Sequence, residues 1–148
     1  MEIEKEIVQS KFESNTQKAI INILFTQSWL ITQFRQVLDP YDITSQQFNV
    51  LRILRGQYPN PATLNLVKER ILDKMSDVSR IVDRLVKKEL VERKTCKSDR
   101  RAVDLLITLK GLALLEQISD EAMKKQIENN ISEDELILLN NLLDKMRG

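Results

Sequence analysis

The sequence predicts a mainly α fold with one small β-hairpin. Only three glycines and three prolines occur in 148 residues, and this scarcity of helix breakers favours long helices. Apolar residues recur every three or four positions through most of the chain, as in helices that bury one face. The pattern changes near the end of the third quarter, where Val103, Leu105 and Ile107 alternate with other side chains as in a strand. The length fits one domain, residues 1–148, that can bury a core without a disulfide or metal.

The first half of the chain predicts three helices. The first covers about 14–38 and ends before Pro40, because the residue preceding a proline is driven out of the helical region. The second begins at Thr44, where Gln47 three residues later completes a capping box. A short third helix is expected at about 63–70.

The second half predicts a further helix, a hairpin and two terminal helices. A tight turn joins the short helix to another at 75–88, which together form a helix-turn-helix candidate. Segments 90–94 and 101–107 are the expected arms of the hairpin. One long helix is predicted from 109 through 127, and a capping box near 132 begins the last. A hairpin wing behind such a unit makes the expected fold a winged helix-turn-helix.

The amino-acid composition excludes most of the common catalytic mechanisms. The chain has no histidine, and Cys96 is its only cysteine. Histidine acid–base chemistry, histidine-activated nucleophiles and zinc sites built from thiolates or imidazoles are therefore excluded. We expect no catalytic residue, no metal and no cofactor, and a protein that is not an enzyme. The single thiol fits a reducing cytoplasm; no apolar run reaches the ~18 residues of a membrane span, and no signal peptide is expected at the N-terminus.

Charge is distributed unevenly along the chain. The net charge is only +1, yet residues 68–101 carry twelve Lys or Arg against seven Asp or Glu. A basic middle between mildly acidic ends indicates a local surface that binds a polyanion. A solvated charged face would give the same composition, so the arrangement of the charges matters more than their number.

The predicted helix at 75–88 has two distinct faces at 100° per residue. Its apolar stripe is expected to be core and contains Val78, Ile81, Val82, Leu85 and Val86. Recognition helices place hydroxyls at base edges in the major groove and cations at phosphates, so we expect DNA contacts from Ser76, Ser79, Arg80, Arg84 and Lys87. An ordinary surface helix would look similar. Asp77 and Asp83 would repel phosphates unless Arg80, Arg84 or Lys87 pairs with them.

The hairpin turn adds a second basic element. Four cations surround the turn, and they are expected to bind DNA: Lys94, Lys97, Arg100 and Arg101. A basic hairpin tip can enter the minor groove, where arginine responds to groove width and negative potential. Asp99 is expected to orient the wing by pairing with Arg101, although such a pair would also stiffen a loop that touches nothing.

Four linked motifs resemble the MarR family of bacterial transcriptional regulators. They are SDVSRIVDRLVKK at 76–88, LVER at 90–93, DRRAV at 99–103 and ITLKG at 107–111. They look like the family's recognition helix, its first wing strand, its wing and the start of its next helix, at the family's spacing. The long first helix and the two terminal helices agree in order and length, so the resemblance extends over nearly the whole chain.

The resemblance implies a homodimer that binds a pseudo-palindromic operator. It implies a DNA-binding lobe at 44–108 and a helical dimerisation region formed by 10–39 and 109–147. It also implies a small-molecule effector, often aromatic, that binds between these two regions. The aromatic residues placed to line such a ligand pocket are Trp29, Phe34 and Tyr41, although aromatic residues at helical spacing more often belong to a core or a dimer interface.

Two positions depart from the family's pattern. Glu89 stands where the family usually has glycine, so another geometry is expected to replace a left-handed turn there. Cys96 lies at the wing rather than in the first helix, so the peroxide-sensing mechanism of some relatives is not carried over. Its proximity to Lys97 would favour the thiolate, but an exposed thiol without a function is the more common case.

These observations predict a dimeric, sequence-specific DNA-binding regulator, a repressor, that reads its operator with the helix at 75–88 and a wing at 90–107. The alternative is a winged-helix module that binds other proteins and not DNA. Binding to duplex DNA at low salt distinguishes the two.

Overall fold

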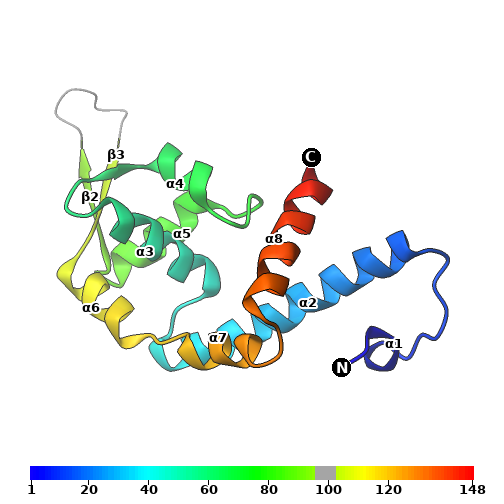
Figure 1. Cartoon of the computed structure of the whole chain (residues 1–148). Helices are drawn as coiled ribbons and strands as arrows, with labels where there is room; N and C mark the ends of the chain where they lie inside the picture. Colours follow the sequence, from blue (N-terminus) through cyan, green and yellow to red (C-terminus); the bar gives the residue numbers. More distant parts are fainter. Residues whose placement is uncertain (96–102) are drawn as a thin grey trace.

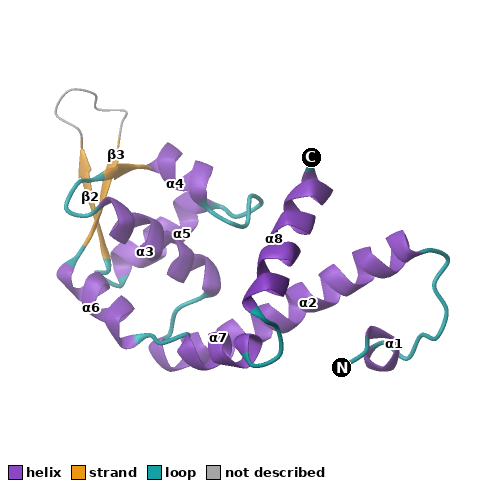
Figure 2. Ribbon diagram, viewed as in Figure 1, coloured by secondary structure: helices purple, strands orange, loops and turns teal. Residues whose placement is uncertain are grey.

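The computed structural model describes residues 1–95 and 103–148 (Figure 1). Within these residues helices predominate, and three short strands form one sheet (Figure 2). The predicted fold class, mainly helical with a small β wing, is confirmed. The elements in chain order are α1 (Ile3–Glu6), α2 (Asn15–Leu38), the 3₁₀ helix η1 (Asp39–Tyr41), α3 (Ser45–Gln57), β1 (Ala62–Thr63), α4 (Leu64–Arg70), α5 (Val78–Lys87), β2 (Val91–Thr95), β3 (Val103–Ile107), α6 (Leu109–Gln117), α7 (Glu121–Glu128) and α8 (Glu133–Arg147).

Most of the buried core lies in the part of the chain from α3 to α6, and Leu38 at the end of α2 joins it. Figure 1 shows α3, α4, α5, α6 and the sheet gathered together, whereas α1, α8 and the N-terminal half of α2 extend away from them. Leu51, Val82 and Leu105 are fully buried where α3, α5 and β3 meet. By contrast, α8 has no buried residue. No helix in the described ranges has the length and apolar character needed to cross a membrane.

The sheet has a strand that the sequence pattern did not indicate. Its order is β1-β3-β2, with antiparallel pairing throughout. β3 is central, so Leu105 pairs with Ala62 on one side and with Arg93 on the other. β1 has two residues, too few for an alternating pattern to be visible. Thr63 ends this strand and also caps α4, since its hydroxyl accepts the Leu66 N–H at 3.1 Å.

The single helix predicted at 109–127 is wrong, because the chain forms α6 and α7 there. Ile118 leaves the helical region with φ −81° and ψ 115°, and its side chain stays in the core at 8% exposure. The Tyr41 hydroxyl donates to the Gln117 carbonyl at 2.8 Å, which satisfies an acceptor that the helix leaves free where it stops. Tyr41 lies 76 residues before Gln117 in the chain. A contact over this separation cannot be recognised from the local sequence, so the break was not predicted.

Gly111 lies where the backbone of α6 comes close to Leu90 and Ile107, which leaves no room for a side chain. A Cβ at this position would lie 2.5 Å from the Leu90 carbonyl oxygen and 2.8 Å from Cγ1 of Ile107. The first turn of α6 therefore packs directly on the base of the hairpin, and the Thr108 hydroxyl caps it by accepting the Gly111 N–H at 3.0 Å. Only glycine leaves room for this contact.

Candidate nucleic-acid interface

α5 exposes one polar face above a buried apolar one. Val78, Val82 and Leu85 are buried at 3% exposure or less, as the apolar stripe predicted. Ser79 is half-buried, and the cations predicted to bind DNA from this helix are all exposed: Arg80, Arg84 and Lys87. The helix is shorter than the expected 75–88 because Asp77 caps it, accepting the Arg80 N–H at 3.2 Å.

Asp77, which precedes α5, and Asp83, within it, are each bound to a group other than the exposed cations of the helix. Asp77 is the N-cap, and Asp83 forms an ion pair with Arg93 of β2 at 2.7 Å. Pairing with Arg80, Arg84 or Lys87 was the condition under which these carboxylates would not repel phosphates, but these three cations form none of the ion pairs found among the described residues. The exposed cations of α5 are thus left available for a polyanion.

Ser76 lies in the turn before α5, not on the helix as predicted. Its hydroxyl donates to Oδ2 of Asp73 at 2.9 Å, while the Met75 N–H donates to Oδ1 at 3.0 Å. These bonds to the ionised form lower the pKa of Asp73, the Ser76 hydroxyl having the larger effect. The only hydroxyl proton of Ser76 is therefore committed, which leaves its oxygen as an acceptor toward any ligand.

The C-terminal end of α5 keeps the left-handed turn that glycine usually supplies. Glu89 has φ 60°, so the expected replacement of this turn by another geometry is wrong. The Glu89 N–H donates to Val86 at 2.9 Å and the Leu90 N–H donates to Leu85 at 3.0 Å, the two bonds of a Schellman cap. The Thr108 hydroxyl also donates to the Glu89 carbonyl at 2.8 Å. These surrounding bonds hold a non-glycine residue in a costly conformation.

Lys88 ties the end of α5 to the corner between α2 and α3. Its Nζ lies 2.8 Å from Oδ2 of Asp42 and also donates to the Asp42 carbonyl. Beside this pair, an open groove of about 560 Å³ includes Arg84 and Lys87 together with Asp39 and Asp42. The C-terminal cations of α5 therefore border acidic residues, whereas Arg80 does not line this groove.

The wing is described only at its base. Lys94 is exposed on β2 and stands opposite Asp104 of β3 in the register. Side chains that are directly opposite share a face of the sheet, so the carboxylate offsets part of the Lys94 charge. The other wing predictions lie outside the described residues, and they concern Lys97, Asp99, Arg100, Arg101 and Cys96.

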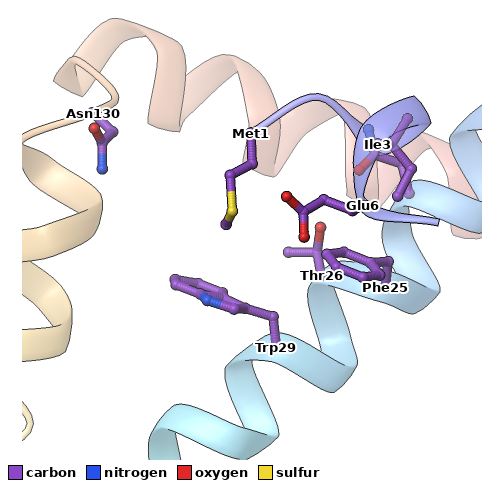
Figure 3. A pocket seen from close by; sticks show the side chains of 8 residues that line it. Met1, Ile3, Glu6, Phe25, Thr26, Trp29 and Asn130 are labelled. Carbon is purple, nitrogen blue, oxygen red and sulfur yellow. The ribbon is translucent and has the colours of Figure 1, made fainter. Parts of the chain in front are cut away.

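The three aromatic residues predicted to line a ligand pocket are not brought together. Trp29 lines an open cavity of about 500 Å³ with Met1, Glu6 and Phe25, between α1 and α2 (Figure 3). Phe34 and Tyr41 do not line it, and instead pack against the core of the lobe. An effector that binds all three is thus not supported by this arrangement, and the effector itself stays a prediction.

Sequence reasoning missed the residues that position α5. Arg93 and Lys88 form ion pairs with residues on other elements, and Asn49 of α3 accepts the Leu72 N–H at 2.9 Å. Asp73 would have been recognisable as the start of an Asx turn, since it precedes a short polar turn. The other three contacts join residues that the sequence separates by 10 to 46 positions.

Comparison with known proteins agrees with this geometry. The family model described as "MarR family" matches residues 43–103. The FarR transcriptional regulator of Neisseria gonorrhoeae is 31% identical over 140 residues, covering 90% of this chain and 92% of that protein. The multiple antibiotic resistance protein MarR of Escherichia coli K12 is 32% identical over 115 residues, covering 75% and 78%.

The structural likeness extends over nearly the whole chain. A mutant of E. coli MarR complexed with operator DNA matches with a TM-score of 0.80 and 27% identity, covering 93% of this chain and 99% of that one. The wild-type apo form of the same regulator matches with a TM-score of 0.67. This chain belongs to the MarR family of winged helix-turn-helix transcriptional regulators.

Proposed function

We propose that the protein is a homodimeric repressor that binds a pseudo-palindromic operator through α5 and the wing. The observation that carries the proposal is the exposed face of α5, where Arg80, Arg84 and Lys87 have no acidic partner among the described ion pairs. The likeness to a regulator solved with operator DNA supports the same use of this helix.

The dimer is supported by apolar side chains that one chain leaves in water. α8 exposes five large apolar side chains by 43–57%, namely Ile137, Leu138, Leu139, Leu142 and Met146. α2 adds Leu24 at 59% and Ile20 at 44%. Single exposed apolar residues are common, but several large ones on the same helix indicate an interface. A second copy of the chain is the occupant that would also give two α5 helices, one for each half of a symmetric operator.

A protein bound at an operator can repress transcription by occupying the DNA that other proteins need. A dimer whose two recognition helices fill successive major grooves excludes other proteins from the same stretch of duplex. A site that overlaps a promoter would therefore be closed to RNA polymerase. Transcription in vitro from the protein's own promoter should fall as the protein is added, and a rise would show that it activates instead.

Binding to DNA upstream of its own gene tests the proposal by fluorescence anisotropy. Affinity should fall steeply with salt, because phosphate contacts release counterions. Arg80→Ala should weaken binding by about tenfold or more. Lys125→Ala, which removes an exposed cation from α7, is the matched control and should bind as the wild type does. Absence of binding to every duplex at low salt would instead favour a winged-helix module that binds proteins.

A further inference from the structure

The turn between α4 and α5 carries two unusually exposed apolar side chains. Met75 is 93% exposed and Leu72 is 84% exposed, more than any other large apolar residue described within 44–108. Single exposed apolar residues are common on protein surfaces. Two of them within four residues, directly before a recognition helix, indicate a contact that the free chain does not make.

Polar contacts hold this turn in place on both sides. The Leu72 N–H donates to Asn49 of α3 at 2.9 Å, and the Met75 N–H donates to Asp73 at 3.0 Å. The Ser76 N–H closes the turn onto the Asp73 carbonyl at 3.1 Å. The backbone is therefore fixed while both apolar side chains project into solvent. Binding a ligand here would cost little conformational entropy, because the turn is already ordered.

The charge around the turn suits one kind of ligand. Lys74 lies between the two apolar residues and Arg80 follows in the first turn of α5, and both side chains are exposed. The neighbouring carboxylates are bound locally, since Asp73 accepts from Met75 and Ser76 within the turn and Asp77 caps α5. The residues at the start of a recognition helix are those that reach base edges in the major groove. In that groove thymine is the base that presents an apolar group, its 5-methyl. Duplex DNA is thus the partner that offers phosphates and apolar contacts together.

We propose that Met75, with Leu72 beside it, reads thymine in the major groove by packing against the 5-methyl group. This inference rests on the proposed function, since it requires α5 to enter that groove. Apolar contact would distinguish thymine from cytosine at a position where the polar side chains of α5 form no bond. The operator should accordingly contain an invariant thymine in each half-site.

The test compares thymine with deoxyuridine, which lacks only the methyl group. The preferred duplex is first selected from a random library with the full-length protein. Each thymine is then replaced in turn. At the thymine that Met75 contacts, the wild type should lose about fourfold in affinity for each half-site, the value for one buried methyl-sized group.

Variants assign the effect to the side chain. Met75→Ala should bind the thymine duplex about as weakly as the wild type binds the deoxyuridine duplex, and should no longer distinguish the two. Met75→Leu should keep the distinction, and Val8→Ala, an apolar truncation at a site 92% exposed outside both the lobe and the dimerisation region, should leave it unchanged. Because Met75 is exposed, none of these variants is expected to disturb folding.

The outcomes separate the inference from the function on which it rests. Equal affinity for thymine and deoxyuridine at every position would overturn the inference alone. A selected site without an invariant thymine, or a Met75→Ala variant that still distinguishes the two bases, would do the same. Failure to bind any duplex would overturn the proposed function as well.

Discussion

The DNA-binding lobe and the helical ends bury their apolar side chains to very different degrees. In the lobe, Leu51, Val82 and Leu105 are completely buried. In α8 no residue is buried, and Leu138 and Leu142 are each more than half exposed. Burial of apolar surface is the main favourable contribution to folding. The lobe therefore has its own source of stability, whereas α8 leaves its large apolar side chains exposed in the single chain.

The same truncation in the two regions should give the largest contrast. Leu51→Ala should lower the free energy of unfolding by about 3 kcal/mol, because it leaves a cavity in a closed core. Leu142→Ala should lower the free energy of unfolding by much less than about 3 kcal/mol. We expect this loss only at protein concentrations at which the proposed dimer forms. Urea denaturation at two protein concentrations measures both. Equal losses would mean that α8 is as self-sufficient as the lobe.

A charge placed on α8 should separate the chains without unfolding the lobe. Leu138→Asp should weaken dimerisation by at least about tenfold, about 1.4 kcal/mol, because a carboxylate would enter an apolar interface. Sedimentation velocity measures the dissociation constant. Leu72→Asp is the control, since it makes the same change at an exposed residue of the lobe. A dimer that tolerates Leu138→Asp would place the interface elsewhere.

Glu89→Gly should stabilise the lobe by up to about 1 kcal/mol. The gain comes from relieving a left-handed conformation that is costly for residues with a Cβ, and it is reduced by the greater freedom of glycine in the unfolded chain. Thermal melting measures the change. The exposed ion pair of Glu89 with Lys110, at 3.2 Å, should matter little. Lys110→Ala removes this pair together with the bond from Lys110 Nζ to the Lys88 carbonyl at 3.0 Å, and so sets an upper limit on its contribution. A loss of stability in Glu89→Gly would show that the pair and the freedom of glycine in the unfolded chain together outweigh the strain.

The smallest effect should come from Asp73, as a dependence of stability on pH. Its pKa is lowered in the folded protein, so the stabilisation is complete above the ordinary value of 3.8 and is lost as the pH falls through the lower folded value. The difference in melting temperature between the wild type and Asp73→Asn should therefore shrink below about pH 4. Glu128→Gln, at an exposed position of α7, serves as the control. A difference that is constant down to pH 2 would contradict this role.

Local signals predicted those features that depend on neighbouring residues. The capping boxes at Thr44 and Ser132 and the apolar stripe of α5 are where the sequence indicates them. Features that depend on distant contacts were missed: the pairing of Ala62 with Leu105 creates β1, and Tyr41 satisfies the end of α6. For the candidate site, residue types were predictable but their partners were not. Ser76 illustrates this, because its commitment to Asp73 changes what it can offer a ligand.

The ion pair between Lys88 and Asp42 connects the two regions mechanically. It joins the end of the recognition helix to the corner at which α2 gives way to α3. The Asp42 side chain is 96% exposed, so water can replace it at a cost of no more than about 1 kcal/mol. The link between the end of α5 and this corner is therefore weak, and its loss would leave the buried residues of the lobe in place.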